Sequence, residues 1–88
     1  MVSERIVVGA LHWAIAATLN ARQRQSGFDI ADDIEELWPL LSMKTRRNVR
    51  EVVIKGIAFL NAQHADSGRW VRFVEACDAL DRKGGLRA

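Results

Sequence analysis

The sequence predicts an all-α domain, a compact bundle of about four helices. Its length of 88 residues suffices for one hydrophobic core and not for two. Hydrophobic residues make up 49% of the chain and charged residues 27%, the balance of an ordinary folded domain. Apolar residues recur every three or four positions, the period of a helix with one buried face. We expect a single helical domain over residues 1–83, followed by a flexible tail at 84–88.

The first helix is expected over residues 4–24. Its apolar residues cover well over half of the circumference and include one continuous row: Ile6, Ala10, Trp13, Ala17 and Ala21. Three short neighbouring helices cannot cover so wide an apolar arc. We therefore expect a homodimer in which residues 6–21 contact a second copy of the chain.

The second helix is expected over residues 30–41, after a break at residues 25–27 where Ser and Gly favour a turn. Two acidic pairs at capping spacing mark its start: Asp33 with Glu36, and the earlier Asp29 with Asp32. Pro39 cannot donate a hydrogen bond to the carbonyl group four residues earlier. A kink or an end of the helix is therefore expected near Trp38.

The third helix is expected over residues 44–63, with Ser42 as its N-cap. Six residues share one face: Val49, Val52, Val53, Ile57, Leu60 and His64. The alternative is a helix that ends at Lys55 and a strand after it, the winged-helix interpretation with a hairpin over residues 57–75. The apolar run from Ile57 does not alternate with polar residues as a half-buried strand does, which favours the helix.

The fourth helix is expected over residues 68–82, after a second break at residues 65–68. Its apolar face holds Trp70, Phe73, Val74, Cys77 and Leu80. We expect four residues to be buried together in the core: Trp13, Val53, Leu60 and Trp70. Cys77 is expected to be a reduced thiol in that core, because a single cysteine can form no intramolecular disulfide.

The net charge of +2 conceals an uneven distribution of charged residues. Residues 44–72 hold seven basic and two acidic residues, whereas the rest of the chain holds six basic and nine acidic ones. Five of the acidic residues fall within 29–36, so an acidic helix precedes a basic one. Basic side chains in the first turns of a helix oppose its dipole, which suggests that they serve a binding role.

The start of the basic helix has the residue types of a DNA-binding surface. Lysine and arginine bind phosphate groups, arginine also reads guanine edges, and asparagine reads adenine. The candidate DNA-binding residues are Lys44, Thr45, Arg46, Arg47, Asn48 and Arg50. A basic helix face that is only solvated surface is the alternative.

The run ELWPLLSMKTRRNV, from Glu36 to Val49, resembles helix-turn-helix and winged-helix regulators of small bacterial and phage proteins. The resemblance extends over residues 29–60. It implies a helix-turn-helix-like pair with a turn at residues 41–43, in a small, dimeric regulator of transcription that binds duplex DNA. A cytoplasmic location is expected separately, because Glu4 offsets Arg5 where a signal peptide would have a basic start. The resemblance directs four side chains toward the DNA: Thr45, Arg46, Arg47 and Arg50. The chain departs from this pattern because no glycine marks the turn and Pro39 lies inside the first helix of the pair.

A second hypothesis is a protein-binding adaptor or inhibitor of the kind that phages and mobile elements encode. It would act through the apolar arc of the first helix or through the acidic residues 29–36, without binding DNA. An enzyme is not expected, because the sequence has no nucleophile elbow and no glycine-rich phosphate loop. No cofactor or metal is expected either, because His12 and His64 lack a second ligand one turn away. The apolar stretch at residues 6–19 is shorter than the roughly 20 residues that span a bilayer, so no membrane contact is expected.

Overall fold

The computed structural model of the chain describes residues 3–84. These residues form four α-helices and, between the second and the third, a short 3₁₀ helix, η1 (Trp38–Leu40). The α-helices are α1 (Glu4–Ala17), α2 (Arg24–Leu37), α3 (Met43–Ala62) and α4 (Gly68–Gly84). The predicted all-α bundle is therefore confirmed. Gly84, expected to begin a flexible tail, is the last residue of α4, and the rest of that expected tail lies outside the described residues.

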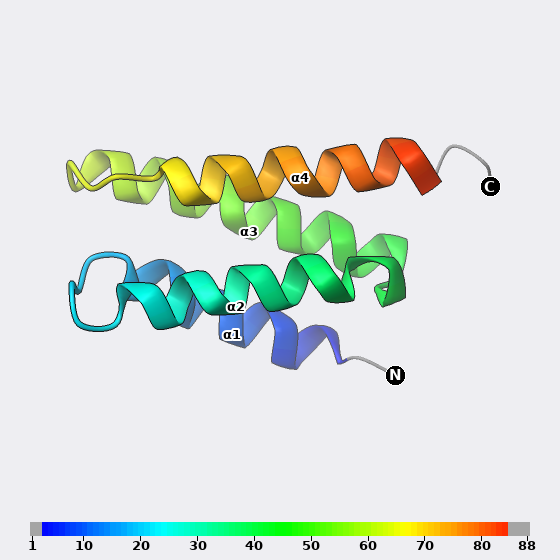
Figure 1. Cartoon of the computed structure of the whole chain (residues 1–88), viewed down its shortest axis with the longest axis horizontal. Coiled ribbons are helices and arrows are strands. Elements are labelled where there is room, and N and C mark those ends of the chain that lie inside the picture. The colour runs from blue at the N-terminus through cyan, green and yellow to red at the C-terminus, as the bar shows by residue number, and fades with distance from the viewer. Residues whose placement is uncertain (1–2, 85–88) are drawn as a thin grey trace.

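The helices alternate in direction along the long axis of the molecule, so that α1 and α3 run one way and α2 and α4 the other (Figure 1). α1 packs against α2 and α3, and α4 packs against the same two helices. α2 and α3 therefore occupy opposite corners of a ring of four, although η1 joins them. The helices of a helix-turn-helix motif cross at about 90–120°, whereas α2 and α3 run in nearly opposite directions (Figure 1). The resemblance to helix-turn-helix regulators rests on the sequence alone.

The expectation that one helix covers residues 4–24 is wrong, because α1 ends at Ala17. Polar side chains bond to the backbone just after this point. Asn20 accepts a hydrogen bond at 3.0 Å from the amide two residues later. Arg24 donates through Nε to the carbonyl oxygen of Thr18 at 2.9 Å, which satisfies a carbonyl group at the end of α1. Local bonds of this kind compete with continuation of a helix.

α2 begins before its predicted start, and the break predicted at residues 25–27 is wrong. The predicted acidic caps are wrong for the same reason, since residues 25–36 all lie inside α2. Gln23 holds the N-cap position and makes no side-chain capping bond. Gly27 lies against α1, where an added Cβ would be 2.7 Å from the carbonyl oxygen of Ala14. This glycine therefore permits a close helix contact and does not make a turn.

The turn between α2 and α3 lies where the sequence predicts it. α2 ends at Leu37, and Pro39 lies in η1, which confirms the predicted end near Trp38. Ser42 is the N-cap of α3, as predicted, and its hydroxyl accepts a hydrogen bond from the amide of Thr45 at 3.1 Å. A serine side chain in this position satisfies one of the free amides of the first turn.

α3 is one continuous helix, so the alternative of a hairpin over residues 57–75 is wrong. No strand occurs within residues 3–84. The chain reverses at residues 63–67, next to the predicted break. His64 adopts a left-handed backbone conformation there, with φ 58°, which is a common way for a helix to end.

The core lies along the line where the four helices meet. Trp38, Trp70 and Phe73 are each at most 1% exposed, and Phe73 makes edge-to-face contacts with both indole rings. The predicted burial of Val53, Leu60, Trp70 and Cys77 is confirmed. Among the described residues, every buried side-chain nitrogen and oxygen atom has a hydrogen-bond partner.

The predicted burial of Trp13 is wrong, because 45% of this residue is exposed. The buried residues of α1 are Val7, Leu11, Ala14, Ile15 and Ala17. Glycines of α2 and α3 approach α1 at Ala14 and Ile15, and these two contacts fix which face of the helix is buried. Ile6 and Trp13 consequently lie on the solvent side of α1.

Candidate functional site

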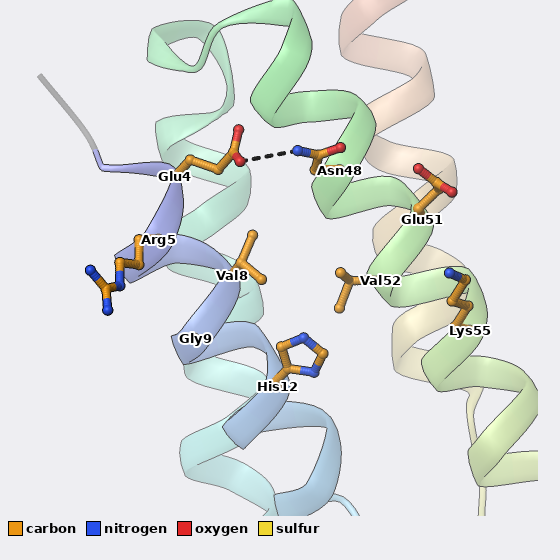
Figure 2. A pocket seen from close by; sticks show the side chains of 9 residues that line it. All are labelled: Glu4, Arg5, Val8, Gly9, His12, Asn48, Glu51, Val52 and Lys55. Carbon is orange, nitrogen blue, oxygen red and sulfur yellow. Dashed lines mark hydrogen bonds between the residues drawn. The ribbon is translucent and has the colours of Figure 1, made fainter.

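The six candidate DNA-binding residues lie in the first turns of α3, but the fold engages most of them in contacts with other helices. Thr45 is buried, and its hydroxyl donates to Oε1 of Glu4 at 3.1 Å. The side-chain amide of Asn48 donates to Oε2 of the same carboxylate at 3.0 Å (Figure 2). Glu4 thereby joins the start of α1 to α3, and the polar groups of both candidates are already bonded within the fold.

Arg46 is held at the end of the bundle where η1 leads into α3. Its Nη1 donates to Oδ1 of Asp81 on α4 at 3.1 Å. Its Nε donates to the carbonyl oxygen of Trp38 at 3.1 Å, and its Nη2 to that of Pro39 at 3.3 Å. Asp81 also accepts a hydrogen bond at 2.9 Å from the indole Nε1 of Trp38. Arg46 therefore ties together η1, α3 and α4.

Arg50 forms a two-pronged ion pair with Asp78 of α4, with 3.0 Å from Nε to Oδ1 and 3.2 Å from Nη2 to Oδ2. This hydrogen bonding and the charge of Asp78 raise the pKa of Arg50. Where α4 meets α2, Arg69 bonds to Glu35 at 2.7 Å and to Asp32. Much of the positive charge of residues 44–72 is thus balanced by carboxylates from outside that segment.

Lys44 and Arg47 are the two candidates that stay on the surface without such contacts. Both are exposed, and they lie three positions apart, about one turn of α3. Neither forms an ion pair with another residue of the described chain. The fold therefore presents two of the six candidate residues to a ligand in solution.

A shallow groove of about 560 Å³ lies between α1 and α3 (Figure 2). Val8 of α1 and Val52 of α3 point toward each other across it, and His12 lies between the two helices (Figure 2). Gly9 leaves the α1 side open, because an added Cβ would meet nothing within 4 Å. A continuation of this groove shares His12 and Val52 and reaches Phe59 further along α3. We call the whole feature the α1–α3 groove.

Large apolar side chains are exposed on the two helices that form this groove. Ile6 is 72% exposed and Trp13 45% exposed on α1, and Phe59 is 47% exposed on α3. We call the groove together with these three residues the α1–α3 surface. In the sequence, the wide apolar arc of the first helix indicates the part of this surface that α1 contributes. Phe59 was missed, because it lies beside the predicted buried row of the third helix and carries no separate signal.

A second hollow lies at the end of the bundle where the α1–α2 and α3–α4 loops meet. Its lining includes three arginines: Arg24, Arg69 and Arg72. Acidic groups balance their charge, since Asp66 lies in the same lining and Arg69 is bonded to Asp32 and Glu35. The hollow is therefore not a strongly cationic site.

The two histidines weighed as metal ligands line different hollows, His12 between α1 and α3 and His64 at the loop end. The described part of the chain brings together no group of three or more His, Cys, Asp or Glu side chains fit to hold a metal ion. Within residues 3–84, no helix is both long enough and apolar enough to cross a membrane. Comparisons with protein-family models, curated proteins and solved structures gave no match.

Proposed function

We propose that this chain is a protein-interaction module, a small helical adaptor or inhibitor that binds an apolar helix of a partner on the α1–α3 surface. The observation that carries the proposal is the exposure of Ile6, Trp13 and Phe59 on the two helices that form a groove with apolar walls. Contiguous exposed apolar groups mark interaction sites, and a groove between helices is a common receptor for an amphipathic helix.

The groove offers the contacts that such a helix requires. Val8 and Val52 supply apolar walls, and charged groups of Arg5, Glu51 and Lys55 line the same groove, where they can bind the polar edge of a partner. Aromatic side chains such as Trp13 often dominate the binding energy of an interface. The basic start of α3 supports a ligand less well, because four of its six candidate residues bond within the fold.

Site-specific photocrosslinking tests this proposal. A photoreactive phenylalanine analogue replaces Trp13 in one variant and the exposed Glu75 of α4 in a matched control. We expect discrete crosslinked adducts between the chain and a partner protein from position 13, and none from position 75. Adding Ile6→Lys should abolish those adducts without unfolding the domain, since Ile6 is exposed. Equal adducts from both positions, or adducts that persist with Ile6→Lys, would contradict the proposal.

DNA binding is the second candidate function, and the exposure of Lys44 and Arg47 favours it. The two cations lie one turn apart at the start of α3 and have no ion-pair partner in the described chain. Both can reach neighbouring phosphate groups of a duplex. Arg50 is a less suitable contact than the sequence indicates, because Asp78 already binds its guanidinium.

Fluorescence polarisation with mixed duplex DNA at two salt concentrations tests this second candidate. Replacing Lys44 and Arg47 together by Ala should weaken binding and lower the slope of log K against log salt by about 0.9 for each phosphate group that the variant no longer neutralises. The exposed acidic pair Asp33 and Glu36, replaced by Ala, is the matched control and should not weaken binding. No binding by the wild type at low salt would remove DNA binding as a function.

A further inference from the structure

Four residues on the solvent side of α1 alternate in size along the helix. Ile6, Gly9, Trp13 and Ala16 are spaced three, four and three positions apart, and all four are exposed. This spacing is that of the contact row of a helix that packs lengthwise on another helix. The first and third residues are large, whereas the second and fourth are small.

We propose that the α1–α3 surface binds a second copy of this chain, with the two α1 helices antiparallel across a two-fold axis at the level of Leu11. In this arrangement Trp13 of each copy lies over Gly9 of the other, and Ile6 lies over Ala16. Each large side chain meets a small one, and the same contact is made twice, as two-fold symmetry requires. The inference rests on the proposed function, because it names the partner of that surface.

Gly9 supplies the space that an indole ring needs. A Cβ at this position would meet nothing within 4 Å, so the fold of a single chain has no need of a glycine there. Gly27 and Gly56 differ, because each allows a close contact between helices of the same chain. A glycine inside a helix weakens it, so the space at Gly9 is better explained by a contact between chains.

The charges on α3 fit the same arrangement. A two-fold axis that reverses α1 also places the two α3 helices antiparallel to each other on the same side of the paired α1 helices. Glu51 and Lys55 lie one turn apart on α3 and line the groove together with Gly9 and His12, so they lie at the level of the proposed axis. Both are exposed, and neither forms an ion pair in the described chain. The axis places each residue opposite the residue of opposite charge in the second copy.

Sedimentation of the purified chain at tens of micromolar, compared with Gly9→Leu, tests the packing. The wild type should sediment as a dimer. A leucine at position 9 fills the space required by the incoming Trp13, so the dimer dissociation constant should rise by about tenfold or more. The variant should fold at least as well as the wild type by circular dichroism, because its added side chain has room and leucine favours a helix.

Charge reversal tests the register independently of packing. Glu51→Lys places like charges opposite each other in a homodimer, and so does Lys55→Glu. Each variant alone should dimerise more weakly than the wild type at low salt. Mixing the two variants should restore a dimer that contains one copy of each, because both contacts across the axis then join opposite charges.

A monomeric wild type would overturn the inference, and so would a dimer that tolerates both Gly9→Leu and the charge reversals. The proposed function can be judged separately from these results. A monomer that still gives adducts with other proteins from position 13 would overturn the second-copy inference and leave the interaction surface standing. The absence of any adduct from position 13 would remove both.

Discussion

Single polar side chains hold distant parts of this small chain together. The indole Nε1 of Trp70 in α4 donates to the hydroxyl of Thr18 at 2.8 Å, and that hydroxyl donates to the carbonyl oxygen of Ala14 in α1 at 3.3 Å. The indole Nε1 of Trp38 donates a hydrogen bond to Oδ1 of Asp81 at the other end of the bundle. A buried donor left without an acceptor costs about 1–3 kcal/mol, so each of these bonds matters to stability.

Replacing Thr18 by Val should lower the free energy of unfolding by about 1–3 kcal/mol. Valine has nearly the same shape, but it leaves the buried Nε1 of Trp70 without an acceptor. Thr18→Ser keeps the hydroxyl and should be less destabilising. Urea unfolding of the two variants measures the difference. A valine variant as stable as the serine variant would show that this hydrogen bond contributes little.

The thiol of Cys77 should be unreactive in the folded protein at mildly alkaline pH. Burial, reinforced by the negative charge of Glu35, raises its pKa from 9.0 to about 12. The unfolded thiol ionises above pH 9 while the folded one keeps its proton, so this group's contribution to stability is lost as pH rises from 9 toward 12. Alkylation before and after denaturation measures the protection. Stability against pH, compared with Cys77→Ala, measures the linkage, and parallel curves would contradict it.

At the scale of elements, the position of α1 is set by two glycines on neighbouring helices. Gly27 of α2 lies against the backbone of Ala14, and Gly56 of α3 lies against the side chain of Ile15. α1 therefore packs closely on two sides, which leaves its third side to solvent. Gly9 lies on that third side, where an added Cβ would meet nothing within 4 Å, so it serves as the control for Gly27 and Gly56.

The three glycines should respond differently to replacement by Ala. Gly9→Ala should stabilise the chain by about 0.5–1 kcal/mol, the usual gain in helix propensity, when measured below the concentration at which copies associate. Gly27→Ala should destabilise it by about 1–3 kcal/mol, because the new Cβ would be 2.7 Å from a backbone oxygen that cannot easily move. Gly56→Ala should fall between them, since the clashing Ile15 methyl group is at the end of a flexible side chain. Thermal unfolding gives the order, and equal effects at all three positions would disprove these contacts.

The elements that the sequence predicted well have local signals at their ends. Ser42 and Pro39 fixed the start of α3 and the end of α2, because a cap and a missing amide act within one turn. The boundary between α1 and α2 was predicted poorly. Gly27 looks like a turn residue until α1 is placed against it, and the turn after Ala17 depends on the bond from Arg24 back to Thr18. Contacts between residues of different helices therefore determine where α1 ends and where α2 begins.

Charged pairs join neighbouring helices around the ring of four. Arg46 and Arg50 link α3 to Asp81 and Asp78 of α4, and Arg69 links α4 to α2. The sequence itself displays the basic segment. It did not predict which cations remain available, because the partner carboxylates are 28 and 35 residues away along the chain. The same limit applies to Trp13, whose exposure depends on the packing of α1.

Replacing Arg46 by Ala should therefore act on the whole fold. The truncated side chain leaves Asp81 without a counter-ion and two η1 carbonyl groups without a donor, so we expect about 1–3 kcal/mol of destabilisation. Arg47→Ala is the matched control on the same turn of α3 and should change stability by no more than about 0.5 kcal/mol. Chemical unfolding of both variants measures the contrast, and equal stability of the two would show that the Arg46 network does not hold the bundle.

The unequal burial of the three tryptophans gives the molecule its own optical probes. The chain has no tyrosine, so its ultraviolet fluorescence comes from indole rings alone. Trp38 and Trp70 are enclosed and bonded through Nε1, and their emission should be blue-shifted and resistant to iodide quenching. In the single chain, Trp13 should emit at longer wavelength and be quenched readily. Quenching of Trp13 thus reports whether a partner covers α1, while the emission of the enclosed pair reports whether the bundle remains folded.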